Sequence, residues 1–254
     1  MQRWEYGMRK EPEDLLDVFI SLKDISYGDP LLSDEEVRAQ VTTVVDNPYG
    51  AAEWALSEML NQPEMLRRAT EEVDRVVGSK DRLLQESDIP HLPYIIACAR
   101  EAVRLHPVAP SNLPHVSIAD CTVAGYFISR GSSILLSRPG LGRNPAVWDD
   151  PLGFDPDRHL ADNRRDLAEA DLRFISFTTG RRGCTGVGLG SNVTVMLLGR
   201  LVQGFTWSIL QGMEKIDLSE AKSLFKATPL YAHAKPRLNP CVYFSLLKSM
   251  SYAS

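Results

Sequence analysis

The sequence lacks several features that would assign its 254 residues to a specialised class. It has no apolar run of about 18 residues, so no segment is expected to span a membrane, and its first residues lack the apolar core of a signal peptide. The four cysteines form no CxxC pair. A zinc site or a disulfide framework is therefore not expected, and a reducing compartment fits best. The net charge of −5 gives no reason to expect binding to nucleic acid.

The composition that is present is typical of a globular domain, with 44% hydrophobic and 24% charged residues. Apolar residues at helical spacing, or helix-like apolar runs, predict helices over residues 33–60, 63–77, 92–105 and 188–203. Shorter β-like stretches broken by glycine lie between the third and fourth of these, and again near the C-terminus. The whole chain, residues 1–254, is therefore predicted to be a single mainly α domain with small β-sheets.

The helix expected over residues 33–60 has a defined start and an internal irregularity. Ser33 is followed three residues later by Glu36, the arrangement of a capping box. Pro48 lies well inside the helical pattern and removes one backbone hydrogen bond, so a kink is expected there.

The segment FTTGRRGCTG, residues 177–186, carries the strongest chemical signal. Cys184 lies among glycines, two residues after Arg182 and just ahead of an apolar helical run. A thiolate is a strong ligand for iron where positive charge or backbone amides stabilise it, and glycines let the backbone pass close to a flat ligand. The alternative is that Cys184 is an ordinary buried or loop thiol.

This segment contains the spacing FxxGxRxCxG, which resembles the haem-ligand signature of the cytochrome P450 monooxygenases. The resemblance implies a heme b cofactor with Cys184 as the axial ligand of the iron. It also implies cofactor contacts from Phe177, Arg182 and Gly186. His115, which follows a proline just before a β-like stretch, is expected to hold a haem carboxylate.

The same resemblance gives a structural role to three charged residues. Glu101 and Arg104 are spaced as ExxR on one face of the helix over residues 92–105, and taken alone they would be an ordinary surface pair. In the family an arginine from a downstream segment joins such a pair. Here FDPDRHL supplies Arg158, so a buried network of Glu101, Arg104 and Arg158 is expected to fix the loop around Cys184.

A finer resemblance is carried by TTVVDNPYGAAEWAL in the long helix. This string is similar to the plant amino acid N-monooxygenases, which hydroxylate an amino acid nitrogen twice and release an aldoxime. The resemblance implies catalytic positions at Asp46, which would handle protons, and Asn47. The alternative is that residues 46–48 are a polar kink without chemistry.

The resemblance implies that the chain is the C-terminal portion of the cytochrome P450 fold and is incomplete. Such enzymes take electrons from NADPH–cytochrome P450 reductase, use O2 and an amino acid substrate, and sit on the cytosolic face of the endoplasmic reticulum through an N-terminal anchor missing here. One alternative is generic hydroxylation of a small molecule. Another is a non-catalytic remnant, which Val44 favours because a small residue is usual there. A protein-interaction module explains none of the spaced motifs.

Overall fold

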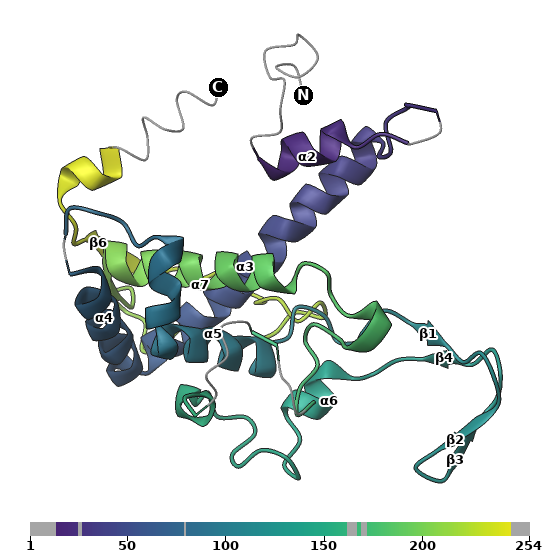
Figure 1. Cartoon of the computed structure of the whole chain (residues 1–254). Helices are drawn as coiled ribbons and strands as arrows, with labels where there is room; N and C mark the ends of the chain where they lie inside the picture. Colours follow the sequence, from purple (N-terminus) through teal and green to yellow (C-terminus); the bar gives the residue numbers. More distant parts are fainter. Residues whose placement is uncertain (1–13, 25–26, 79, 162–166, 169–171, 245–254) are drawn as a thin grey trace. The chain divides into compact units, whose positions relative to one another are not determined.

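The computed structural model describes residues 14–24, 27–78, 80–161, 167–168 and 172–244 (Figure 1). The chain divides into two compact units, residues 1–47 and residues 48–254. The boundary falls inside a helix, immediately before Pro48, where one backbone hydrogen bond of the helix is missing.

The first unit contains α2 (Leu15–Ser21) and the first half of α3 (Asp34–Asn61). The capping box predicted at the start of α3 is confirmed. The Ser33 Oγ accepts a hydrogen bond from the Glu36 amide at 3.3 Å, and the Glu36 carboxylate accepts one from the Ser33 amide at 2.8 Å. These bonds satisfy backbone donors that the first turn of a helix leaves free.

The second unit is built on α4 (Pro63–Val77), α5 (Pro93–Leu105) and α7 (Val187–Gly204), together with the second half of α3. The buried carboxylate of Glu72 on α4 accepts hydrogen bonds from the amides of Tyr94 and Ile95 at 2.9 to 3.0 Å. Those amides are free donors at the start of α5, so Glu72 caps α5 from a neighbouring helix.

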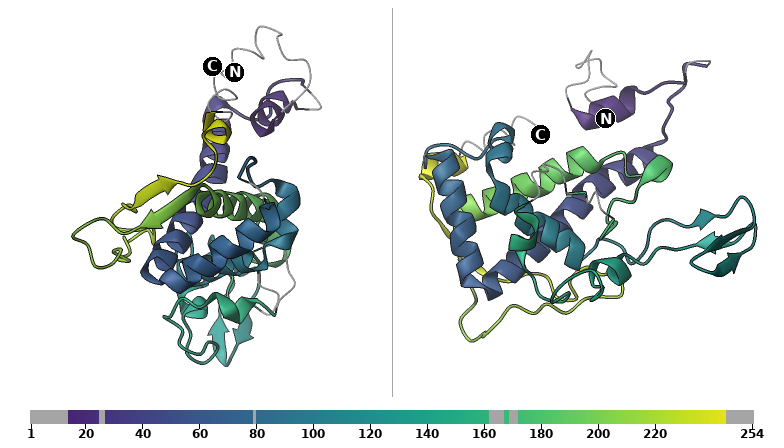
Figure 2. Two further views of the ribbon diagram at one scale, coloured as in Figure 1. Left: turned by 90° about the vertical axis from the view of Figure 1, so that its left-hand side faces the viewer. Right: turned by 60° about the horizontal axis from the view of Figure 1, so that its bottom comes forward.

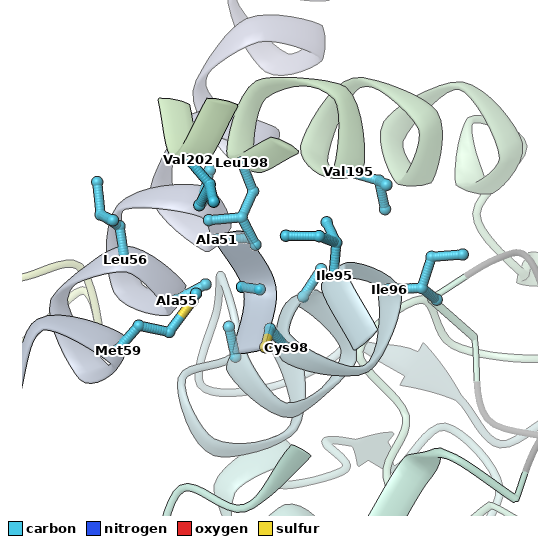
Figure 3. Packing of buried hydrophobic residues seen from close by; sticks show 14 of the residues in the cluster. Ala51, Ala55, Leu56, Met59, Ile95, Ile96, Cys98, Val195, Leu198 and Val202 are labelled. Atoms are coloured by element: carbon cyan, nitrogen blue, oxygen red, sulfur yellow. The ribbon is translucent and has the colours of Figure 1, made fainter. Parts of the chain in front are cut away.

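The core of this unit lies where these helices meet (Figure 3). Ala55 of α3 and Cys98 of α5 are both small and fully buried in this core. Met59 of α3 and Leu198 of α7 belong to the same buried cluster. The core therefore fixes α5 and α7, the two helices that flank the candidate site.

Three two-stranded antiparallel sheets complete the second unit. They pair β1 (His115–Val116) with β4 (Ser133–Ile134), β2 (Cys121–Val123) with β3 (Tyr126–Ile128), and β5 (Phe205–Ser208) with β6 (His233–Pro236). The β2–β3 hairpin extends away from the helices of its own unit (Figure 2). The prediction of a mainly α fold with small sheets is confirmed. Among the described residues, no helix is both long and apolar enough to cross a membrane.

Short helices occur in the region between residues 138 and 185, where the sequence pattern predicted no helix. They are α6 (Arg138–Gly142) and the 3₁₀ helices η2 (Pro156–His159) and η3 (Gly180–Arg182), and a further one, η1 (Glu86–His91), precedes α5. Single turns of this kind carry little apolar periodicity, so the sequence pattern does not reveal them.

Candidate functional site

The loop that leads into α7 is closed by hydrogen bonds within itself. The amide of Cys184 donates to the carbonyl oxygen of Phe177 at 2.9 Å, and the Thr178 hydroxyl donates to the carbonyl oxygen of Arg182 at 2.8 Å. The Phe177 ring packs against the hydrophobic core, whereas Cys184 is exposed. The backbone of the loop is thus anchored while Cys184 remains accessible.

Two glycines shape the approach to α7. Gly180 has a φ of 68°, a conformation that few residues with a side chain adopt. Gly186 is the N-cap residue of α7, and a methyl group placed on it would lie 3.9 Å from the Cys184 Sγ. Cys184 therefore lies beside the N-terminus of an 18-residue helix, whose free amides carry partial positive charge.

A half-buried arginine adds positive charge near the sulfur. Burial lowers the pKa of Arg138, at the start of α6, and the proximity of Cys184 partly offsets this. The Arg138 Nε is buried without a hydrogen-bond partner among the residues that the structure describes. A buried guanidinium N–H of this kind suits an anionic neighbour.

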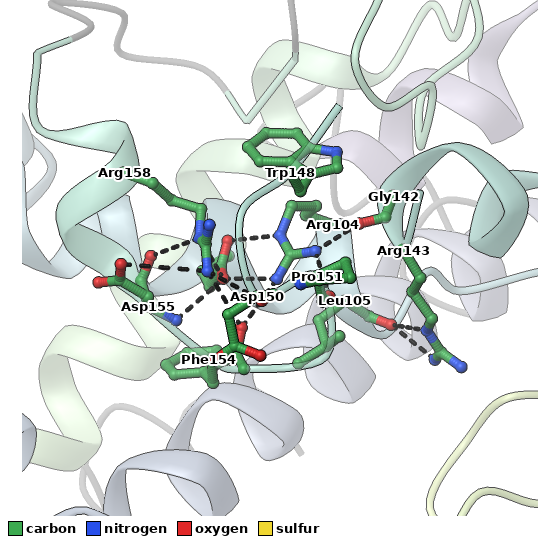
Figure 4. Close-up of polar contacts among 12 residues, drawn as sticks. Arg104, Leu105, Gly142, Arg143, Trp148, Asp150, Pro151, Phe154, Asp155 and Arg158 are labelled. Atoms are coloured by element: carbon green, nitrogen blue, oxygen red, sulfur yellow. Dashed lines mark hydrogen bonds and ion pairs between the residues drawn. The ribbon is translucent and has the colours of Figure 1, made fainter. Parts of the chain in front are cut away.

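Glu101 on α5 is the centre of a charge network, whose members Arg104 and Arg158 are labelled in Figure 4. Its carboxylate accepts hydrogen bonds from Arg104 at 2.6 and 2.7 Å and from the Arg158 Nε at 3.1 Å. Burial acts to raise the pKa of Glu101, but the hydrogen bonds from Arg104 and His159 outweigh it and lower the pKa to about 2. The structure thus brings together the three residues of the expected network.

The two arginines also hold the chain that follows α6. Arg104 donates to the carbonyl oxygens of Pro151 at 2.9 Å and Gly153 at 3.0 Å, and also to that of Gly142. Arg158 donates to the carbonyl oxygen of Asp149 at 2.8 Å. An irregular segment would otherwise leave these acceptors unsatisfied, so the network fixes it against α5.

The network has a further member that the sequence did not reveal. The His159 Nε2 lies 2.7 Å from Glu101 Oε2, and both side chains are fully buried. The sequence offered one signal, since His159 directly follows Arg158 in FDPDRHL. The spacing of the histidines gave no reason to connect it with Glu101, 58 residues away.

The remaining expected site residues lie on other elements. Asp46 and Asn47 are exposed residues of α3, at the end of the first unit. His115 lies on β1 opposite Ile134 and is half-buried, and Arg182 ends η3 with an exposed side chain. The roles expected of these residues stay predictions.

A model of the cytochrome P450 family matches residues 1–234. The chain belongs to the cytochrome P450 family. This cytochrome P450 chain is 63% identical to a tryptophan N-monooxygenase of Prunus mume, across 96% of this chain and 47% of that protein. It is 59% identical to a tyrosine N-monooxygenase of Sorghum bicolor, across 96% of this chain and 45% of that protein. It therefore spans about half the length of the curated relatives it matches.

The fold agrees with solved members of the family. A zebrafish cytochrome P450, in a structure with abiraterone, has a TM-score of 0.74 and is 27% identical, with 89% of this chain and 54% of that chain covered. The chain is thus a portion of the cytochrome P450 fold.

The residues around Cys184 fit the haem of such a protein. Cys184 offers an accessible sulfur on an anchored loop, and Arg138 offers a buried N–H without a partner among the described residues. A haem presents an iron that accepts a thiolate and carboxylates that accept from arginine. Both kinds of group are therefore available at or near this loop.

Proposed function

We propose that this chain is the iron-ligating portion of an amino acid N-monooxygenase, with Cys184 as the axial ligand of the haem iron. The observation that carries the proposal is an exposed cysteine on a hydrogen-bonded loop at the N-terminus of α7. Its identity of 63% to a tryptophan N-monooxygenase supports the reaction class.

The residues of the loop would divide the binding of heme b among them. Cys184 would ligate the iron, and Phe177 and Gly186 would flank the macrocycle. Arg182 and His115 would donate hydrogen bonds to its carboxylates. When bound, a haem supplies the redox-active iron that activates oxygen for insertion into a substrate.

The chain's own groups would prepare that chemistry. The amides at the N-terminus of α7 and the Arg138 guanidinium would place positive charge beside the ligating sulfur of Cys184. We further propose that Asp46 and Asn47 handle protons. Electrons would come from NADPH–cytochrome P450 reductase, and O2 would be the oxidant. The enzyme would act at the endoplasmic reticulum membrane, held there by an anchor outside this chain.

The proposed substrate is an amino acid, hydroxylated twice on nitrogen and released as an aldoxime after loss of carbon dioxide and water. Relatives of this chain are named as N-monooxygenases of tryptophan, tyrosine, phenylalanine and valine, at 57% to 63% identity. Hydroxylation of a carbon atom in another small molecule is the alternative within the family.

A chimaera tests this proposal, because the chain covers 45% of the tyrosine N-monooxygenase from Sorghum bicolor. The corresponding part of that enzyme is replaced by this chain, and the product is assayed with tryptophan, tyrosine, phenylalanine and valine. We expect an aldoxime from at least one of them. Cys184→Ser should abolish it, whereas Cys121→Ser, at an exposed cysteine on β2, should not. A haem-loaded chimaera that forms no N-hydroxylated product would contradict the proposal.

A further inference from the structure

His159 makes one directed polar contact from a fully buried ring. Its Nε2 lies 2.7 Å from Glu101 Oε2, while Arg158 Nε binds the other carboxylate oxygen at 3.1 Å. The pKa of Glu101 is lowered to about 2, so the carboxylate is ionised at neutral pH and can only accept. The His159 Nε2 must therefore carry a hydrogen and donate it.

The rest of the His159 ring lies against aromatic side chains. Trp148 and Phe174 meet it edge-on, with ring centroids 5.9 and 6.2 Å away. The Nδ1 is buried without a hydrogen-bond partner among the described residues. The surroundings of His159 therefore contact two features of its side chain, the Nε2 donor and the flat ring. Phenylalanine would supply only the shape, whereas glutamine can supply a donor at the distance of Nε2.

The segment in contact with this ring leads directly to Cys184. Two residues after Phe174 comes Ser176, whose hydroxyl donates to the carbonyl oxygen of Val103 on α5 at 2.6 Å. The next residue, Phe177, accepts the hydrogen bond from the Cys184 amide at 2.9 Å. One short stretch of chain thus touches His159, α5 and Cys184 in turn.

We propose that His159 is a positioning residue for Cys184, acting through the hydrogen bond from its Nε2 to Glu101. That bond fixes the orientation of the His159 ring, and Phe174 packs against this ring. Phe174 in turn fixes the position of the chain at the start of the Cys184 loop. The inference rests on the proposed role of Cys184 as the iron ligand. The order that it predicts in the loop can nevertheless be measured without haem.

A nitroxide label on Cys184 measures this order. The background carries Cys121→Ser and Cys241→Ser, and the remaining cysteine, Cys98, is fully buried and does not react. Electron paramagnetic resonance then gives the rotational correlation time of the label, and far-UV circular dichroism verifies that each variant is folded.

Three variants separate positioning from general stability. His159→Phe keeps the ring and removes the donor, and we expect the correlation time to fall by about half. His159→Gln keeps the donor, and the label should remain as ordered as in the parent. His106→Phe is the matched control, because it removes the bonds from another buried histidine, to Glu58 at 2.8 Å and Glu220 at 3.0 Å, in a different network. It should leave the label unchanged.

Several results would overturn the inference. One is a correlation time in His159→Phe equal to that of the parent. Another is a fall in correlation time in His159→Gln or in His106→Phe as large as that in His159→Phe. If His159→Phe unfolds, the decision falls to His159→Gln, where loss of label order overturns the inference and retained order supports it.

A parallel haem titration of the unlabelled proteins separates this inference from the proposed function. One result is a label that is less ordered in His159→Phe but not in His159→Gln, while the parent chain gives no thiolate-type spectrum. That result contradicts the proposed function and supports the positioning role of His159. If the parent gives that spectrum and His159→Phe leaves the correlation time of the label unchanged, the positioning role of His159 is contradicted and the proposed function is supported.

Discussion

The Glu101 network and the Cys184 loop lie in the same unit and treat their polar groups in opposite ways. The Glu101 carboxylate is fully buried and accepts hydrogen bonds from Arg104, Arg158 and His159. In the loop, the backbone is hydrogen-bonded but Cys184 is exposed. Near it, the Arg138 Nε has no partner among the described residues.

This difference indicates that the Glu101 network is suited to hold the chain rigidly and that the Cys184 loop is suited to bind a ligand. A buried carboxylate that meets several donors is a rigid centre, because each charge depends on the others for its solvation. A cysteine on a fixed backbone with an accessible sulfur is suited to bind a ligand at a defined place. The network therefore holds chain segments in place, whereas the loop presents an accessible sulfur.

The largest expected effect comes from removing the charge at the centre of the network. Among the described residues, Glu101→Gln leaves the buried guanidinium group of Arg104 without a counter-charge, and it leaves Arg158 with only the carboxylate of Asp155 at 4.0 Å. We expect the free energy of unfolding to fall by about 3 to 5 kcal/mol. Urea unfolding at neutral pH, followed by circular dichroism, measures it. Glu64→Gln, which breaks an exposed pair with Arg67, is the control and should leave the midpoint unchanged.

If Glu101→Gln were no more harmful than Glu64→Gln, the network would not be the rigid centre that the comparison describes.

Acid should weaken the network over a defined range of pH. The Glu101 pKa is lowered from 4.5 to about 2 in the folded chain, so the unfolded chain binds a proton first as the pH falls. The resulting stabilisation is present above about pH 4.5 and is lost as the pH falls toward 2. It is on the order of 3 kcal/mol.

Unfolding free energies measured from pH 6 down to the acid limit test this range, in the parent and in Glu101→Gln. The acid-dependent loss should be smaller in the variant by the amount that Glu101 contributes. Parallel curves for the two proteins would contradict the assigned pKa shift.

A smaller effect is expected from adding a methyl group beside the network. In Gly142→Ala the new carbon would meet the backbone oxygen of Arg104 at 2.3 Å, so the chain must shift. We expect a loss of about 1 to 3 kcal/mol in the free energy of unfolding. Gly188→Ala, in the first turn of α7, meets nothing within 4 Å and should be neutral or stabilising by up to about 1 kcal/mol.

Thermal melts of the two variants measure both changes side by side. Equal melting temperatures would mean that the packing beside Arg104 is no tighter than that in the first turn of α7.

Local patterns in the sequence predicted much of the fold. The bounds of α4 agree with the predicted residues 63–77, because the helix begins at a proline and ends before Gly78, whose φ of 67° terminates it. The contact between Glu101 and Arg104 follows from their spacing on one helix face.

The parts that the sequence did not predict depend on contacts between distant segments. His159 and Ser176 are brought to α5 only by the folded path of the chain, and Arg138 lies near Cys184 for the same reason. The sequence singled out the loop around Cys184 by its fixed spacing, and its role as an iron ligand stays a prediction. Its hydrogen bonds to Phe177 and within η3 required the structure.

The measurement that tests the central claim most directly is the absorption spectrum of the reduced chain with carbon monoxide, after titration with haem. Three proteins are compared: the parent, Cys184→Ser and Cys121→Ser. If Cys184 ligates the iron, the parent and Cys121→Ser will share a strongly red-shifted Soret band that Cys184→Ser lacks. A band that persists in Cys184→Ser, or its absence from a folded parent, would contradict the assignment of Cys184 as the iron ligand of this chain.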